Sequence, residues 1–233
     1  MKNNFCLKRT HPPVWQHDYH TLKKLFFSLS YLRDKYLKKK SEVILDYGCG
    51  SLPYKNLFIN YTKQYIGIDL PSNKKADIKV DKDKKIPLKN NIADLIISTQ
   101  VIEHVENVDF YLQECHRLLK KGGLLMLSTH GVWPYHQYPS DFHRWTRKGL
   151  EIILENYKIK CQETISILGP FASITQFTLI IIAEKLSNKN IIAKILIVIF
   201  SLVGNCIIWL ENKLFPPTEE SDASVYVICA KKI

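Results

Sequence analysis

Short apolar runs alternate with segments of helical periodicity along most of this chain of 233 residues. The first five runs have the length and composition of buried strands: 43–47, 65–69, 78–80, 94–99 and 123–129. Because helical or turn segments separate them, the connections are crossovers and the strands are expected to form a parallel sheet. The chain is long enough for one α/β domain with a sizeable core.

Two helices and two further strands complete the predicted pattern. Leucines recur at helical spacing between residues 18 and 39, which predicts an amphipathic helix with lysines on its outer face. Leu112, Cys115 and Leu118 predict another helix over 108–120. Residues 161–168 and 225–230 are expected to be the sixth and seventh strands.

The loop after the first strand carries the strongest functional signal. Gly48-Cys49-Gly50 directly follows the apolar run that ends at Tyr47, so the backbone can approach a ligand at the carboxyl end of the sheet. Pro53 stands where a dinucleotide site has its third glycine, whereas Asp46 suits a ligand with a positive amino group. Asp69 ends the second strand, where a carboxylate can accept both hydroxyls of a ribose.

Asp46-x-Gly48-x-Gly50 followed by Asp69 resembles the class I S-adenosylmethionine-dependent methyltransferases. Later segments agree in order, with Asp81 where that class has an acid near the adenine, 93–98 as the fourth strand and 118–125 as the turn into the fifth. The resemblance covers residues 42–130 and the last strand. Leu52 departs from it, because many members have a glycine there.

This resemblance implies a fold, a domain organisation and a cofactor. The fold is α/β, a Rossmann-like seven-stranded methyltransferase sheet with helices on both faces, an antiparallel last strand and a helical insertion before it. Residues 1–40 are then a basic N-terminal arm and helix, 41–168 the core, 169–220 an apolar helical insertion and 221–233 the final strand. The implied cofactor is S-adenosyl-L-methionine, bound by Asp46, Tyr47, Gly48, Cys49, Gly50, Asp69, Leu70, Asp81 and Gln100.

The residues after the fourth strand narrow the chemistry. Methyltransferases that act on adenine amines place an Asn/Asp-Pro-Pro-aromatic motif here, and residues 99–105 (TQVIEHV) contain none, which argues against adenine N-methylation. Some relatives bind a divalent cation through Glu-x-x-Glu-His, but here Gln100 replaces the first glutamate. No metal is therefore expected, and Gln100 and His104 are expected to line the cofactor pocket.

Residues 128–146 follow the fifth strand and should cover the edge of the sheet where a methyl acceptor sits. Here the resemblance narrows to bacterial type 11 methyltransferase domains that occur with polysaccharide and lipid-linked glycan genes. These carry similar Gly-Val-Trp-Pro-Tyr-His and Asp-aromatic-x-Arg-aromatic-Thr segments. The narrower resemblance spans about residues 45–150, and His130 stands where those domains usually have a proline.

The same loop supplies candidate acceptor and base residues. Aromatic rings can stack on sugars or bases, and a histidine with a pKa near 6.5 can take a proton from a hydroxyl. His136 is the first choice for the base, with His130 or His104 second. The candidate substrate residues are Trp133, Tyr135, Tyr138, Asp141, Arg144 and Trp145. A structural ion pair between Asp141 and Arg144, with the aromatic rings as loop core, is the alternative.

The net charge of +11 is concentrated in two places. Residues 1–40 contain ten Lys and Arg against two Asp, and 74–89 contain seven Lys against three Asp. Such patches suit nucleic acid, an anionic membrane or a phosphorylated substrate, with solubility alone as the alternative. Both lie outside the catalytic loop, which favours a membrane or phosphorylated carrier over nucleic acid.

The six cysteines are far apart and show no zinc or disulfide spacing, which is typical of reduced thiols in the cytoplasm. Residues 1–13 contain lysines but no apolar run behind them, so no secretory signal is expected.

A long apolar region precedes the last strand. Residues 164–183 and 195–210 contain no charge, but Gly169-Pro170 interrupts the first run and the second is short for a membrane span. On a helical projection Lys194, Ser201, Asn205 and Asn212 form one narrow polar stripe. The remaining faces would be buried in the protein, in a partner subunit or in a membrane interface on the inner face, and the sequence leaves these alternatives open.

The sequence therefore predicts a methyltransferase that acts on an acceptor hydroxyl, in a saccharide of surface or lipid-linked glycan biosynthesis. The saccharide rests on family analogy. An RNA or protein methyltransferase, or a cofactor-binding accessory subunit without catalysis, are the alternatives. The expected location is cytoplasmic, and the oligomeric state is left open.

Overall fold

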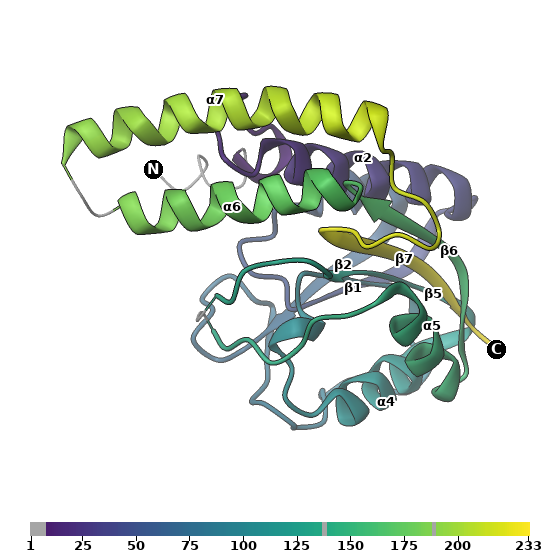
Figure 1. The fold of residues 1–233 in the computed structure, drawn as a ribbon. Coiled ribbons are helices and arrows are strands. Elements are labelled where there is room, and N and C mark those ends of the chain that lie inside the picture. The colour runs from purple at the N-terminus through teal and green to yellow at the C-terminus, as the bar shows by residue number, and fades with distance from the viewer. Residues whose placement is uncertain (1–7, 137–138, 188–189) are drawn as a thin grey trace.

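The centre of the computed structural model, which describes residues 8–136, 139–187 and 190–233, is a seven-stranded sheet in the order β3-β2-β1-β4-β5-β7-β6 (Figure 1). The strands are β1 (Ser41–Tyr47), β2 (Thr62–Asp69), β3 (Ile78–Lys79), β4 (Ala93–Thr99), β5 (Leu119–His130), β6 (Ile159–Ile167) and β7 (Val225–Lys232). The first five pair in parallel, and β7 runs antiparallel between β5 and β6. The expected Rossmann-like sheet, antiparallel last strand and preceding helical insertion are confirmed.

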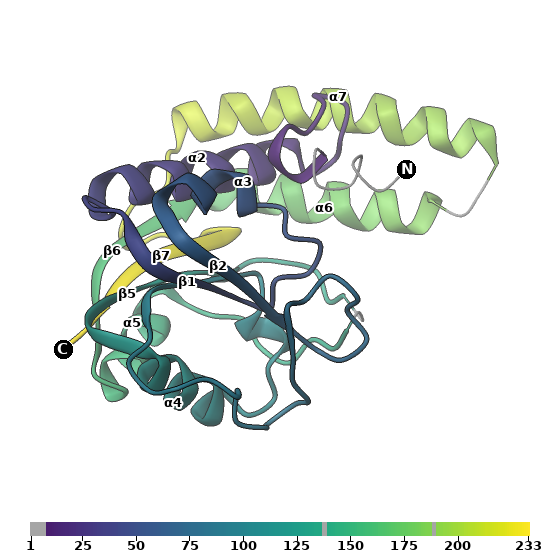
Figure 2. The same cartoon turned by 180° about the vertical axis from the view of Figure 1, so that it is seen from behind.

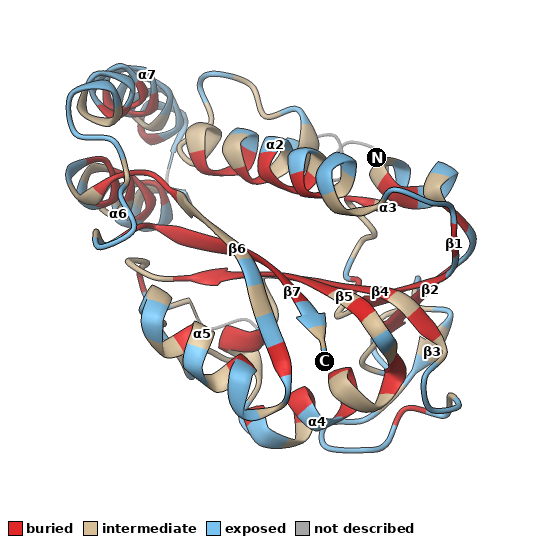
Figure 3. Ribbon diagram, turned by 90° about the vertical axis from the view of Figure 1, so that its right-hand side faces the viewer, coloured by how far each residue is buried: buried red, intermediate tan, exposed pale blue. Residues whose placement is uncertain are grey.

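Helices cover both faces of the sheet (Figures 2 and 3). One face carries α4 (Val108–Leu118) and α5 (Arg147–Asn156), and the other carries α2 (Tyr19–Tyr36), the short α3 (Lys55–Phe58) and α6 (Pro170–Leu186). Helix α7 (Ile191–Leu214) packs on α6 and α2 as the outermost element of that second layer. Two 3₁₀ turns, η1 (Ile59–Tyr61) and η2 (Ile102–His104), complete the described elements.

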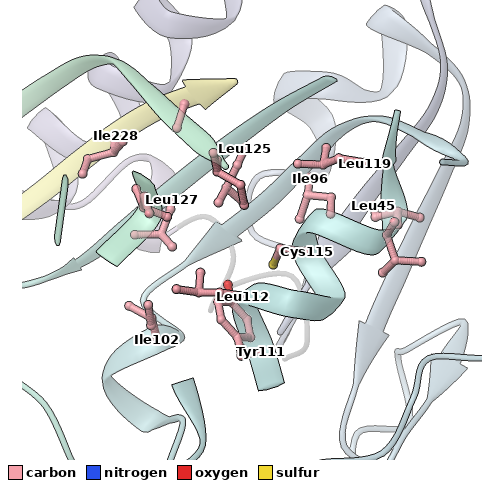
Figure 4. Close-up of a cluster of buried hydrophobic side chains, with 14 of the residues drawn as sticks. Leu45, Ile96, Ile102, Tyr111, Leu112, Cys115, Leu119, Leu125, Leu127 and Ile228 are labelled. Atoms are coloured by element: carbon pink, nitrogen blue, oxygen red, sulfur yellow. The ribbon is translucent and has the colours of Figure 1, made fainter. Parts of the chain in front are cut away.

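The α4 side of the sheet holds the larger core cluster (Figure 4). Tyr111, Leu112 and Cys115 on α4 meet Leu45 of β1 and Ile96 of β4, and all five side chains are buried. Alternate residues of the same strands face the opposite layer, where Ile44 and Leu95 pack in the α2 cluster. The central strands are thus buried on both faces, which explains their nearly continuous apolar sequences.

Helix α2 is an integral layer of this fold. Leu25, Leu29 and Leu32 are buried against the sheet, as their helical spacing predicts. The helix ends at Tyr36 rather than at residue 39, and the lysines at 38–40 are exposed.

Helix α5 has no counterpart in the sequence prediction. Its N-cap is Thr146, whose Oγ1 accepts a hydrogen bond of 3.1 Å from the Gly149 amide. Leu150 and Leu154 then bury its inner face. The uncharged run 164–183 divides at Gly169-Pro170, with β6 before it and α6 after it, because proline fits the first turn of a helix.

Close packing of α6 on α7 depends on one glycine. A Cβ atom at Gly204 would lie 2.5 Å from a methyl carbon of Leu179, a side chain that is itself buried. The two helix backbones can therefore approach here only because residue 204 has no side chain.

We expect Gly204→Val to destabilise the fold by about 1–3 kcal/mol, because overpacking forces α6 and α7 apart. Urea unfolding followed by circular dichroism measures this. The matched control is Cys206→Val, which adds a branched side chain at an exposed position of the same helix and should change stability by less than about 0.5 kcal/mol. Equal stabilities of the two variants would contradict the packing assignment.

Candidate active site

The carboxyl ends of β1, β2, β4 and β5 meet at one edge of the sheet, around a cavity of about 890 Å³. The loop after β1 forms its floor, and the amides of Gly48 and Cys49 both donate to the Ile68 carbonyl of β2, at 2.8 and 3.1 Å. The turn after β1 is therefore fixed to the neighbouring strand. The cavity lies where parallel α/β sheets bind ligands.

Gly48 is required by both its conformation and its surroundings. Its φ of +80° lies in the left-handed region, and a Cβ atom there would lie 2.4 Å from a methyl carbon of Val101. Leu52, at the position where many class I members have glycine, also has a positive φ, of 61°. The backbone thus keeps the left-handed turn although the sequence supplies a leucine.

Asp69 faces the cavity from the end of β2 and organises the loop beside it. Its Oδ2 accepts hydrogen bonds from the Gly50 amide at 2.8 Å and from the Asn73 side-chain amide at 2.7 Å, and its Oδ1 accepts from the Leu70 amide at 2.8 Å. Asn73 also donates to the Gly50 carbonyl at 2.7 Å. The sequence analysis missed Asn73, which lies four residues after the end of a strand in a loop that shows no pattern.

Asp46 lies beneath the loop, and it does not form part of the described cavity wall. Its side chain is buried, and its Oδ2 accepts a 2.7 Å hydrogen bond from the Tyr65 hydroxyl. Burial raises the pKa of Asp46 to about 7, with a smaller contribution from the nearby Asp69 carboxylate, while the Tyr65 bond acts in the opposite direction.

The other expected cofactor residues line the cavity. They are Tyr47, Gly48, Cys49, Gly50, Leu70, Asp81 and Gln100. Gln100 has a φ of 57°, and the Gln100 amide donates to the Ser128 carbonyl at 2.9 Å. Such a strained residue persists only where its surroundings hold it, and here the ends of β4 and β5 do so.

Three histidines come together on the opposite wall of the cavity. The His136 ring lies edge-on to His104 at 4.6 Å and to His130 at 5.4 Å between ring centroids. His104 Nδ1 donates to the Ser140 carbonyl, which can only accept, so Nε2 is the acceptor nitrogen of the neutral ring. Burial lowers the pKa of His104 below its usual 6.5 and keeps the ring neutral at pH 7.

His130 lies beside an acid, Glu103, that was not among the predicted site residues. Its Nδ1 lies 3.3 Å from Oε1 of Glu103, and both side chains are buried. Burial raises the pKa of Glu103 to about 7 and lowers that of His130. Glu103 Oε2 also accepts a 3.0 Å hydrogen bond from the Thr129 hydroxyl, which links η2 to the end of β5. Glu103 is the second glutamate of the Glu-x-x-Glu-His comparison made from the sequence, but that comparison does not indicate that it lies against His130.

Asp141 and Arg144 hold the acceptor loop together. They form a double hydrogen bond with both N–O distances at 2.6 Å, and Arg144 donates to the carbonyls of Trp133 and Pro134. Asp141 Oδ2 also accepts from the His136 backbone amide at 2.9 Å. Neither side chain is part of the described cavity wall, so the geometry matches the structural ion pair considered as the alternative.

The aromatic candidates are divided among different surroundings. Trp133 lines the cavity and stacks on His130, with ring centroids 4.5 Å apart and an interplanar angle of 4°. Trp145 packs against the core cluster on the α4 side, whereas Tyr135 is 69% exposed. Tyr138 lies outside the described residues.

The N-terminal segment contributes an unexpected wall. Arg9, Asp18, Thr21 and Leu22 line the same cavity, so the segment before α2 and the first turn of α2 belong to the site. From the sequence, the basic charges of residues 1–40 were expected to lie outside the catalytic loop, and nothing in their pattern indicates that this segment lines the cavity.

Residues 15–153, more than half of the chain, match the profile of a family described as a methyltransferase domain. The chain belongs to this family of methyltransferase domains. This family assignment confirms S-adenosylmethionine, the cofactor that the sequence predicted.

A curated relative is also named as a methyltransferase. The ubiquinone biosynthesis O-methyltransferase of Pelagibacter ubique is 29% identical over 102 residues, covering 39% of this chain and 42% of that protein. The chain thus matches less than half the length of the first curated relatives.

Two solved structures share the fold at low identity. The [4+2]-cyclase SpnF has a TM-score of 0.60 at 15% identity, covering 91% of this chain and 83% of that one. Phosphoethanolamine N-methyltransferase 2 of Haemonchus contortus, in complex with phosphomonomethylethanolamine and S-adenosylhomocysteine, has a TM-score of 0.55 at 16% identity, covering 97% and 59%. At this identity they show the fold alone.

The described residues fit S-adenosylmethionine on their own geometry. The cofactor needs a close backbone approach, an acceptor for ribose hydroxyls and an acidic group near its adenine. Gly48, Asp69 and Asp81 supply these at one cavity.

We expect Asp69→Asn to weaken S-adenosylmethionine binding by about 10–100-fold, because the amide loses charge-assisted acceptor capacity toward the ribose and the Gly50 amide. Isothermal titration calorimetry measures the affinity. Asp109→Asn makes the same chemical change on α4, where the carboxylate bonds the Tyr157 hydroxyl, and should leave the affinity unchanged. Unaltered binding by Asp69→Asn would remove Asp69 from the site.

Proposed function

We propose that this protein transfers a methyl group from S-adenosylmethionine to a hydroxyl of a saccharide, carried on a lipid or on a phosphorylated carrier in glycan assembly at the cytoplasmic face of a membrane. The observation that carries the O-methyl transfer is the histidine cluster, which faces the same cavity as the glycine loop and Asp69. The saccharide itself rests on the resemblance of residues 128–146 to glycan-associated methyltransferases. The named O-methyltransferase relative agrees with an oxygen acceptor.

The cofactor-side residues have distinct proposed roles. Asp69 accepts the ribose hydroxyls, the backbone of Gly48–Gly50 approaches the amino-acid part, and Asp81 and Leu70 border the adenine. Asp46 acts from beneath the loop, because a carboxylate with a pKa of about 7 gains its charge when a positive amino group approaches. Tyr47, Cys49 and Gln100 complete the wall.

The chain's own task in catalysis is to orient the acceptor and remove one proton. When bound, the cofactor supplies a sulfonium methyl group as the electrophile. The chain's residues would hold the acceptor hydroxyl toward that methyl group and would pass the hydroxyl proton to a histidine. Positioning in a closed cavity and proton removal each lower the barrier.

We assign the proton acceptor to His104 rather than to His136, the first choice from the sequence. The Ser140 carbonyl fixes the proton on Nδ1 of His104, which leaves Nε2 ready to accept another. His136 packs against the His104 ring and positions it. His130 lies beside Glu103, and Trp133 stacks on its ring as a flat platform for a sugar ring.

We expect His104→Ala to lower kcat by about 10²–10⁴-fold, because general base catalysis contributes that much. His136→Ala should cost less, and His116→Ala, on α4 away from the cavity, should cost nothing. Steady-state kinetics with labelled cofactor measures this. A larger loss in His136→Ala than in His104→Ala would return the role of base to His136.

The pH profile provides an independent check. A base must be neutral to act, and burial lowers the pKa of His104, so kcat should be constant near pH 7 and fall only below pH 6.5. The acidic limb should be absent from His104→Ala. An unchanged limb in that variant would contradict the assignment.

Transfer of labelled methyl to fractionated cell extracts tests the acceptor class. Label in the lipid-linked glycan fraction supports the proposal. Label in RNA or protein would contradict the proposal and would indicate an RNA or protein methyltransferase. Cofactor binding without any transfer would indicate an accessory subunit.

A further inference from the structure

Helix α7 presents its apolar side chains to the outside of the molecule. Among the described residues it is the one helix long and apolar enough to span a membrane, and only 28% of its most apolar window is buried. Ile195, Ile199, Val203 and Trp209 are each about half exposed. Isolated apolar residues on a surface are ordinary, but a continuous apolar helix face marks an interaction site.

Three of the four residues of the narrow polar stripe of α7 face inward, and the fourth, Lys194, is exposed. Ser201 and Asn205 are buried, and Asn205 Nδ2 donates to the carbonyls of Val14 and Gln16 at 2.7 and 3.0 Å. Asn212 Oδ1 accepts from the Gly169 amide at 3.0 Å. The helix therefore turns most of its polar side chains inward and its apolar side chains outward, whereas an ordinary water-exposed helix has its polar face toward solvent.

A groove of about 630 Å³ lies between α7 and α2 and joins this apolar face to positive charge. Phe27, Trp209 and Leu210 form its apolar part, and Lys23 and Lys24 supply ammonium groups. Lys24 is half-buried with no acidic partner among the described residues, and burial lowers its pKa. The Lys24 ammonium can bind the anionic headgroup of a phospholipid, and the apolar rings beside it can contact the acyl chains below that headgroup.

Charge selects the occupant of this surface. One wall of the groove comes from the segment 1–40, which contains ten basic residues and two acidic ones. A second copy of the chain docked symmetrically would bring like charges together, which opposes association. Anionic phospholipids offer both the apolar phase and the opposite charge.

We propose that the outer face of α7 and the α2–α7 groove dock this protein onto an anionic phospholipid surface, with α7 lying in the interfacial plane. A spanning orientation is disfavoured because α7 packs along α2, whose Lys23 and Lys24 would enter the hydrocarbon. Trp209, with the Lys213 ammonium 5.4 Å from its ring, supplies the aromatic and basic pair typical of an interface. This docking does not depend on the identity of the methyl acceptor.

The first turns of α2 connect this surface with the active site. Thr21 and Leu22 line the catalytic cavity, and Lys23 and Lys24 line the groove. The cavity and the groove therefore share the first turns of α2, which suits an acceptor that is itself carried on a lipid.

Co-sedimentation with vesicles tests the proposal. The wild-type protein should bind vesicles of phosphatidylcholine containing one quarter phosphatidylglycerol, bind phosphatidylcholine alone much more weakly, and dissociate as salt is raised. The double variant Ile199→Glu, Val203→Glu should lose more than about tenfold in vesicle affinity, because carboxylates would enter the apolar interface. Lys23→Gln with Lys24→Gln should lose roughly thirtyfold on the anionic vesicles only.

Ile152→Glu is the matched control, because Ile152 is 47% exposed on α5, in the layer on the opposite face of the sheet. This variant should bind vesicles like the wild type. Calorimetric binding of S-adenosylmethionine by every variant shows that each is folded.

Equal vesicle binding by the α7 double variant, or no binding by the wild type, would overturn the proposal. If the wild-type protein binds no vesicles but forms a dimer in sedimentation velocity, and the α7 double variant disrupts that dimer, the face would be assigned to a second copy of the chain. Failure of methyl transfer to glycans would leave the docking result intact, so the two proposals fail separately.

Discussion

The hydrogen bond from the Gly50 amide to Asp69 fixes the relation between two strand ends, and the site is built around it. Parallel pairing of β1 and β2 brings both carboxyl ends to one edge, but pairing alone leaves the following loops free. One carboxylate closes them by accepting from Gly50, Leu70 and Asn73 together. The floor of the cavity is therefore shaped by the protein's own bonds.

The two walls of the cavity are held in place by different interactions. The cofactor side is formed by strand ends whose positions follow from sheet register. The other wall is a loop, where the Arg144–Asp141 pair and backbone hydrogen bonds such as that of the Trp145 amide to the His130 carbonyl take the place of secondary structure. Specificity can change on the loop side while the cofactor side stays constant, as expected for a scaffold that presents functional loops.

Most of the sheet and the cofactor side could be predicted from the sequence because they follow local patterns. Buried strands have apolar runs, and the turn at Gly48 needs a residue without a side chain. Asp46 shows where such reasoning stops, since its pattern does not reveal that the carboxyl lies under the loop on Tyr65. Glu103, Asn73 and the α2 wall depend on contacts between distant segments, which no short motif records.

The order of the strands has a consequence for synthesis. Strand β7 lies between β5 and β6 in the sheet, yet it follows α6 and α7 in the chain. During translation β6 has no neighbour to pair with until residues 225–232 leave the ribosome. The apolar helical hairpin emerges earlier, while the sheet beneath it is still open, so α7 can meet a bilayer or a chaperone before the domain that carries it has closed.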